Sequence, residues 1–139
     1  MNILFLDEKN KKNDIIIISV FCNENILLCR KVGSKTWEFP GGHIEENETE
    51  YEAAIRELYE ETGIQCKYSF KEISDFEVIN DNNRIYGRLF YLKLDDSYIS
   101  EPLKYEMEET RWFFSLPKDI SYPYQSKIIE KINKSIIQK

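Results

Sequence analysis

The chain has 139 residues and a formal net charge of −6, with charged residues at 32% and hydrophobic residues at 42%. This length predicts a single domain over residues 1–139, and the composition excludes a disordered chain. The acidic balance excludes the clustered basic surface that binds duplex nucleic acid, whereas a small phosphorylated ligand held through a bridging cation is compatible with it.

The start of the chain and its cysteines favour a cytoplasmic protein. Met1–Leu6 lacks the basic beginning, the long apolar run and the cleavage site of a signal peptide. No stretch approaches the roughly 18 apolar residues that cross a bilayer, so we expect no membrane partner. Cys22, Cys29 and Cys66 are odd in number and form no CxxC pair, which indicates reduced thiols in the core rather than a metal or redox site.

The first part of the chain predicts strands. After a short strand near Asn2–Leu6, the run Asp14–Cys22 is rich in isoleucine, as expected for a strand that is covered on both faces. Asn23–Asn25 then turns the chain into Ile26–Arg30, which completes a hairpin.

A helix is predicted over Thr49–Glu61, with signals at both of its ends. Thr49 and Glu52 are three residues apart and have the spacing of a capping box. Gly63 follows the last turn, where glycine accepts the left-handed conformation that ends a helix. The helix is therefore well delimited by local chemistry.

Further strands follow the helix. Ile64–Phe70 alternates apolar and polar residues, as in a half-buried strand. Phe76–Ile79 and Arg84–Leu94 are the next two strands, and Asp81–Asn83 is the turn between them.

The end of the chain predicts one more strand and a second helix. Glu109–Phe114 reads as the strand, and Pro117 ends it. Tyr124–Ile137 carries isoleucines at helical spacing, which is typical of a packing helix. Strands combined with one early and one late helix predict a layered α/β or α+β fold with a helix on each face of the sheet.

The glutamates of the predicted early helix occupy an unusual place. Glu57, Glu60 and Glu61 fall within an arc of about 100° on a helical wheel. They lie in the last turns, where the helix dipole disfavours anions, and Glu57 repels Glu61 at the i, i+4 spacing. Such a face is most often only solvated. A divalent cation would offset both costs, because hard Mg²⁺ or Mn²⁺ prefers oxygen ligands and bridges carboxylates to phosphates, so the helix predicts a metal-dependent phosphate site.

The loop before the helix can complete this site. Gly41 and Gly42 permit positive φ angles and the close approach of a ligand or metal to a backbone carbonyl, although a Gly-Gly pair is more often just a turn. Arg56 can orient Glu48 of this loop through a bidentate ion pair. We expect that pair to support the site rather than to perform chemistry.

The segment Gly42–Ile64 resembles the Nudix box, the hallmark of Nudix hydrolases. The box reads Gly, five residues, Glu, seven residues, then Arg-Glu-aliphatic-any-Glu-Glu-any-Gly-aliphatic, and the chain matches every fixed position. The matching residues are Gly42, Glu48, Arg56-Glu57-Leu58, Glu60-Glu61 and Gly63-Ile64. The flanks, with Glu38–Gly42 before the box and a Tyr-Pro pair before the last helix, resemble the MutT type, which hydrolyses nucleoside triphosphates.

The resemblance implies a fold and a reaction. The fold is a Nudix-type α/β/α sandwich with a mixed central sheet, a catalytic loop-helix-loop and a C-terminal packing helix. The reaction is hydrolysis of a nucleoside diphosphate linked to another group, by water attack at phosphorus, with Mg²⁺ as cofactor and Mn²⁺ as substitute. The implied metal ligands are Glu57, Glu60, Glu61 and the carbonyl of Gly41 or Gly42. The implied candidates for the catalytic base are Glu57, Glu60 and Glu106, of which Glu106 can equally be a surface acid.

Three residues are candidates for substrate binding. Gln125 resembles the position at which MutT-type enzymes read the purine edge, but it can also simply open the last helix. His43 follows the glycines and can contact phosphate. Phe39 can line the pocket, or it can belong to the core, as aromatics at a strand end usually do.

The substrate that remains after comparison with family subtypes is a nucleoside triphosphate, cleaved to monophosphate and pyrophosphate. An oxidised purine such as 8-oxo-dGTP is included. ADP-ribose, nucleotide sugars and dinucleoside polyphosphates are alternatives, although the residues beyond the box lack their markers. An enzyme acting on RNA ends and a non-catalytic nucleotide sensor are further alternatives, and a homodimer stays open.

Overall fold

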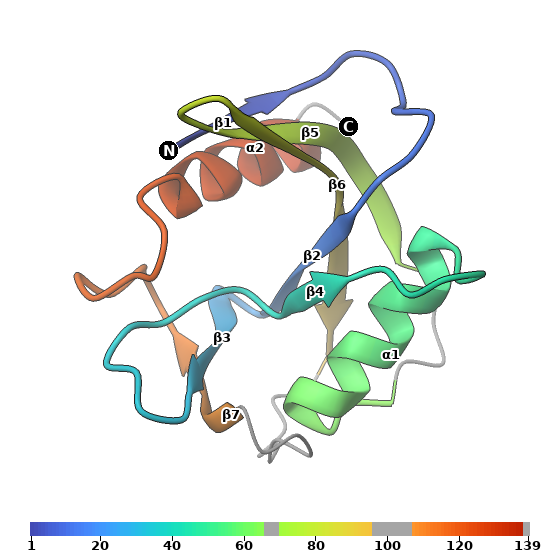
Figure 1. Cartoon of the computed structure of the whole chain (residues 1–139). Coiled ribbons are helices and arrows are strands. Elements are labelled where there is room, and N and C mark those ends of the chain that lie inside the picture. Colours follow the sequence, from blue (N-terminus) through green and yellow to red (C-terminus); the bar gives the residue numbers. More distant parts are fainter. Residues whose placement is uncertain (66–69, 96–106, 138–139) are drawn as a thin grey trace.

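The structure is a computed structural model that describes residues 1–65, 70–95 and 107–137, and Figure 1 shows its arrangement. Cys66, most of the strand predicted over Ile64–Phe70 and Glu106 lie outside the described residues. The described strands are β1 (Asn2–Phe5), β2 (Ile15–Cys22), β3 (Asn25–Lys31), β4 (Gly41–His43), β5 (Lys71–Asn80), β6 (Asn83–Leu94) and β7 (Met107–Phe113), and the described helices are α1 (Glu50–Thr62) and α2 (Gln125–Ile137).

The strands form one mixed sheet. Its order is β1-β5-β6-β2-β3-β7, and β4 also pairs with β2. β2 and β6 run parallel over the whole length of β2, whereas the other pairs are antiparallel. The parallel pair places β2 in the interior of the sheet, as its nearly continuous apolar sequence predicts.

The two helices cover opposite faces of this sheet (Figure 1). Successive side chains of a strand point to opposite faces, and β2 therefore serves two cores. Ile16 and Ile18 pack with Leu58 of α1. Ile17 packs in the second core with Ile128 and Ile132 of α2. The predicted layers and the predicted packing helix are confirmed.

The ends of α1 follow the local signals. The Thr49 hydroxyl accepts a hydrogen bond from the Glu52 backbone at 3.1 Å, and the Glu52 carboxylate accepts one from the Thr49 backbone at 2.9 Å. Gly63 adopts φ 78° and donates its N–H to the carbonyl of Tyr59 at 2.8 Å. The capping box and the glycine stop are confirmed, and the helix spans Glu50–Thr62.

The two glycines before α1 form a strand rather than the expected loop with positive φ. Gly41 and Gly42 pair with Ile17 and Ile16 of β2 as part of β4, and among the described glycines only Gly33 and Gly63 have positive φ. A side chain at Gly41 would collide with the carbonyl oxygen of Ile16. The expectation of positive φ was wrong, because these glycines are required for the close approach of backbone and side chains instead.

Within the described ranges, the structure contains no helix that combines the length and the apolar character needed to cross a membrane.

Candidate active site

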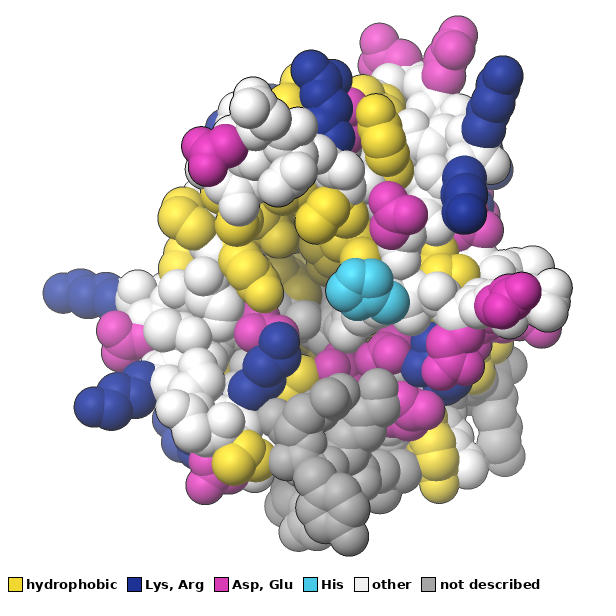
Figure 2. All heavy atoms as spheres, viewed as in Figure 1, with side chains coloured by type: hydrophobic (Ala, Val, Ile, Leu, Met, Phe, Trp, Pro, Cys, Tyr) yellow, Lys and Arg dark blue, Asp and Glu magenta, His cyan; other side chains and the backbone are white. Residues whose placement is uncertain are grey.

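A cleft of about 520 Å³ opens beside β4, and the middle of α1 and the segment before α2 form its walls. Glu57 and Glu61 of α1 line its acidic end. Ile17, Val78 and Ile128 belong to its apolar end. Figure 2 shows hydrophobic side chains inside the hollow and acidic side chains along one side of it. This volume lies in the range of small-ligand sites, so the cleft can hold a molecule with one anionic and one apolar part.

The two glutamates at the acidic end are buried rather than solvated. Glu57 is 4% exposed and Glu61 is 3% exposed. Glu61 accepts the N–H of Gly41 at 2.8 Å. The carboxylate of Glu57 lies so close to Gly42 that an added Cβ would stand 2.7 Å from its carboxyl carbon. Buried carboxylates are costly unless partnered, so β4 both covers this acidic end and helps to satisfy it.

Arg56 connects the loop, β4 and the helix. Its Nε and Nη2 donate to the two carboxylate oxygens of Glu48 at 2.7 and 2.9 Å, which is the expected bidentate pair. Nη1 donates to Glu57 at 2.7 Å and lies 3.4 Å from Glu60. Nη2 also donates to the carbonyl of His43 at 3.0 Å. The guanidinium is therefore the positive charge that the structure places among the box glutamates.

These contacts shift the pKa values of Arg56 and Glu48. The hydrogen bond to Glu48 is the main cause of the raised pKa of Arg56, and Glu57 adds to it. The same hydrogen bond from Arg56 holds the pKa of Glu48 below its usual range. Both shifts favour the charged forms, so the ion pair is stable across neutral pH.

The donor set at the acidic end suits a hard divalent cation. Glu57 and Glu61 offer carboxylate oxygens there, Glu60 offers a further carboxylate beside Arg56, and Gly41 and Gly42 offer backbone carbonyls, which are the ligand types that Mg²⁺ prefers. In the part of the chain that the structure describes, no three His, Cys, Asp or Glu side chains are gathered closely enough to hold an ion. Glu57 is at the same time the ion-pair partner of Arg56, at 2.7 Å.

The other predicted site residues do not all reach the cleft. Phe39 and His43 line it, and Phe39 is also 7% exposed and part of the second core. Glu60 does not line it, and its side chain is 30% exposed beside Arg56. Glu106 lies outside the described residues.

Gln125 lines the cleft, but its amide is bound to backbone. The side chain donates to the carbonyl of Trp37 at 3.2 Å and accepts the N–H of Tyr122 at 3.1 Å. The residue is 1% exposed and is the first residue of α2. These bonds correspond to the alternative in which Gln125 opens the last helix.

Two charged and two aromatic residues are among the cleft residues that the sequence reasoning did not propose. Lys31 and Glu38 form an ion pair at 3.6 Å, and the rings of Tyr122 and Tyr124 stack with centroids 5.4 Å apart. All four line the cleft. Glu38 could have been noticed as the first residue of the flanking Glu38–Gly42 stretch, and the two tyrosines from the Tyr-Pro pair before the last helix, whereas Lys31 has no local signal.

Comparison with protein families matches the NUDIX domain to residues 12–118. This chain belongs to the Nudix hydrolase family. An RNA pyrophosphohydrolase from Tolumonas auensis is 44% identical over 48 residues, which are 33% of this chain and 28% of that relative. The match thus spans less than a third of that curated relative's length.

Solved Nudix structures share the fold. A pyrophosphohydrolase from Bacillus subtilis superposes with a TM-score of 0.75 at 20% identity, over 96% of this chain and 90% of that one. The NUDIX domain of Shewanella oneidensis NrtR, complexed with ADP ribose, gives 0.75 at 13% identity, over 92% and 90%. The Nudix sandwich expected from the box is confirmed.

Proposed function

We propose that this chain is a Mg²⁺-dependent pyrophosphohydrolase that cleaves a nucleoside 5′-triphosphate to monophosphate and pyrophosphate. The observation that carries the proposal is the pair of buried carboxylates, Glu57 and Glu61, at one end of a cleft whose other end is apolar and aromatic. A nucleotide has the matching polarity, because its phosphates need a cation beside carboxylates and its base needs an apolar, stacking surface. A cytoplasmic location belongs to the same proposal.

The residues of the box then have distinct tasks. Glu57, Glu60 and Glu61, with the carbonyl of Gly41 or Gly42, would hold the cation. When bound, Mg²⁺ or Mn²⁺ neutralises phosphate charge and lowers the pKa of water.

Two further tasks fall to the chain's own side chains. Arg56 and Glu48 keep the start of the box against α1, as their bidentate contact supports. A carboxylate takes the proton of the attacking water, and Glu57, Glu60 and Glu106 are its candidates.

A second candidate substrate is the triphosphorylated 5′ end of RNA. It is favoured by the 44% sequence identity between this chain and an RNA pyrophosphohydrolase over 48 residues. The net charge of −6 disfavours a long RNA contact, because such contacts rely on clustered basic residues. The two candidates share the triphosphate and the chemistry, and they differ in whether an RNA chain is attached to the first nucleotide.

The test is a hydrolysis screen of the purified chain with Mg²⁺. The substrates are canonical and oxidised nucleoside triphosphates, a triphosphorylated RNA oligonucleotide, ADP-ribose, a nucleotide sugar and a dinucleoside polyphosphate. We expect monophosphate and pyrophosphate from the triphosphates, and no reaction in EDTA. Turnover of the RNA alone would support the second candidate. Cleavage confined to ADP-ribose, the nucleotide sugar or the dinucleotide would contradict both, and no cleavage at all would contradict the enzyme assignment.

A further inference from the structure

Glu38 has more hydrogen-bonding capacity than the protein uses. Its side chain is 14% exposed and lines the cleft. A carboxylate accepts about four hydrogen bonds through its two oxygens. Among the described residues its carboxylate has one polar partner, the Lys31 ammonium at 3.6 Å. An enclosed carboxylate that faces a cleft with free acceptor sites is suited to a ligand that presents N–H donors.

The position of Glu38 is held by backbone pairing. Its N–H and carbonyl exchange hydrogen bonds with Cys29 of β3 at 2.9 and 2.8 Å. These bonds do not involve the carboxylate. A change of the side chain therefore leaves the bonds that hold this segment in place.

Aromatic rings stand close to this carboxylate. Tyr122 and Tyr124 stack with an interplanar angle of 10°. Burial raises the pKa of Tyr124, and the interactions with Tyr122 and with the Glu38 carboxylate contribute. Glu38 is likewise the largest cause of the raised pKa of Lys31. Lys31, Glu38, Tyr122 and Tyr124 therefore form one wall of the cleft, here called the Glu38 wall.

The amide of Gln125 is not available for the same task. It is bound to the backbone of Trp37 and Tyr122 on both its donor and its acceptor side. The residue is 1% exposed, so turning this amide toward a base would break these buried bonds, which is costly. The carboxylate of this wall is that of Glu38, and it keeps open acceptor sites.

Guanine is the base whose edge fits a carboxylate. Its Watson–Crick edge presents two adjacent donors, N1–H and the 2-amino group, to which a carboxylate can bind in bidentate fashion. Adenine presents an acceptor beside a donor, so its N1 lone pair would face the negative charge. We propose that Glu38 accepts hydrogen bonds from N1–H and the 2-amino group of a guanine base stacked on Tyr122. This inference rests on the proposed function and makes guanosine nucleotides its preferred substrates.

The test compares three nucleotides that differ in this edge. GTP has both donors, inosine triphosphate lacks the 2-amino group, and ATP lacks both the 2-amino group and N1–H. The variants are Glu38→Gln, which retains shape and loses charge, and Glu24→Gln, an exposed glutamate of the β2–β3 turn, as control. For wild type and control, we expect kcat/KM to fall about tenfold from GTP to inosine triphosphate and further to ATP. For Glu38→Gln, we expect similar kcat/KM values for GTP, inosine triphosphate and ATP.

A second measurement separates this inference from the proposed function. Calorimetry in EDTA measures the binding of the same three nucleotides without turnover. If the chain hydrolyses triphosphates but does not favour GTP, or if Glu38→Gln keeps the preference, the guanine inference is overturned and the function stands. If nothing is hydrolysed, but wild type binds GTP more tightly than inosine triphosphate and Glu38→Gln loses this difference, the proposed function is contradicted and the guanine inference is supported. If Glu38→Gln loses turnover equally on all three nucleotides, the inference that Glu38 recognises the base is overturned, and Glu38 acts in the hydrolysis step instead.

Discussion

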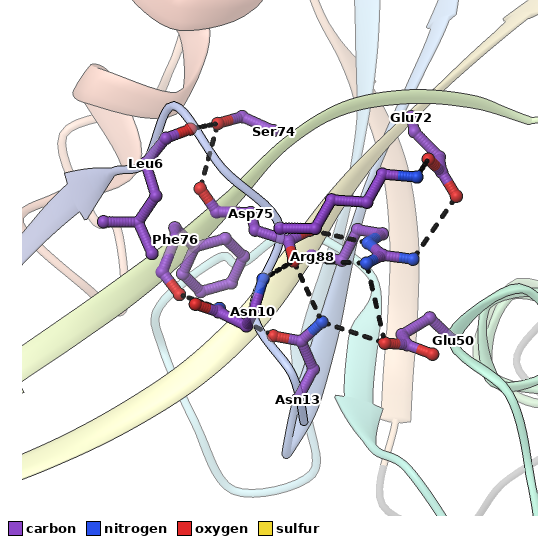
Figure 3. A network of polar contacts seen from close by, with 10 residues as sticks. Leu6, Asn10, Asn13, Glu50, Glu72, Ser74, Asp75, Phe76 and Arg88 are labelled. Carbon is purple, nitrogen blue, oxygen red and sulfur yellow. Dashed lines mark hydrogen bonds and ion pairs between the residues drawn. The ribbon is translucent and has the colours of Figure 1, made fainter.

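Two arginine-centred clusters contact α1, one at its first turn and one at its middle. Arg88 of β6 donates to Asp75 of β5 at 2.6 Å and lies 3.7 Å from Glu50 in the first turn of α1, as Figure 3 shows. Arg56 of α1 itself pairs with Glu48 at 2.7 Å. Both use the planar fork of arginine to bind a carboxylate at two points.

The clusters differ in what surrounds the carboxylate that the arginine binds. The oxygens of Asp75 accept hydrogen bonds from Arg88, from the Asn10 backbone and from the Asn13 amide, and its side chain is 2% exposed (Figure 3). The cluster of Arg56 instead ends at Glu57, which lines the cleft. The oxygens of Asp75 are thus occupied by protein donors, whereas the cluster of Arg56 borders the cleft through Glu57.

The largest expected effect is a loss of activity, and it comes from a substitution in the Arg56 cluster beside the cleft. Glu57→Gln should lower Mg²⁺-dependent turnover by about a thousandfold, because it removes a charge from the acidic end and a candidate base. Steady-state hydrolysis of GTP measures it, and circular dichroism checks the fold. Glu46→Gln, in the exposed loop before the helix, is the matched control. Turnover near that of wild type would remove Glu57 from the site.

A large effect on stability is expected from the enclosed cluster. Asp75→Asn leaves the guanidinium of Arg88, whose side chain is 11% exposed, without its main partner. The free energy of unfolding should fall by about 3 kcal/mol, while activity per folded molecule is kept. Urea unfolding measures this change, and Asp81→Asn in the exposed β5–β6 turn is the control. A variant as stable as wild type but inactive would reverse the proposed division between the two clusters.

A moderate effect is expected when the fork of Arg56 is replaced by a point charge. Arg56→Lys keeps the charge but cannot bind both oxygens of Glu48 and also reach Glu57. We expect turnover or Mg²⁺ affinity to fall about tenfold, as is typical for residues that orient metal ligands. Mg²⁺ titration of the initial rate measures it, with Arg84→Lys as a control on an exposed arginine. Unchanged kinetics would mean that Arg56 supplies charge alone.

The smallest expected effect is a pH dependence of the enclosed cluster. Burial tends to raise the pKa of Asp75, but hydrogen bonds from Arg88, Asn10 and Asn13 outweigh it, so the pKa is lowered. A lowered folded-state pKa adds stability that is present above the unfolded value of about 3.9 and is lost as pH falls through the folded value. The stability gap between wild type and Asp75→Asn should therefore shrink below about pH 4. A gap that stays constant from about pH 7 to about pH 2.5 would contradict this account.

The sequence was most informative where the interactions are local. The capping box of Thr49 and Glu52 and the stop at Gly63 act within one helical turn, and both formed as predicted. The arc of Glu57 and Glu61 also follows from helical geometry alone. Of the predicted arc of Glu57, Glu60 and Glu61, the structure places Glu57 and Glu61 at the cleft but not Glu60, and a helical wheel cannot say that β4 would bury the first two carboxylates.

Strand extents were less predictable because they depend on distant partners. β5 begins at Lys71, five residues before the predicted start at Phe76, since it pairs with β6 along its length and with β1 at its end. Its charged residues hide this extent from a search for apolar alternation. β4 has two glycines in three residues, so no side-chain pattern marks it as a strand.

The sequence by itself determined the family, the two helices, the layered fold and the acids of the box, because each rests on spacing within a short segment. Only the tertiary structure decided that Gln125 is bound to backbone, that Arg56 donates to the carbonyl of His43 in β4, and that Lys31 and Glu38 share one wall with the tyrosines. These contacts join residues from separate strands, loops and helices. Their partners are chosen by sheet pairing and packing, which no local pattern encodes.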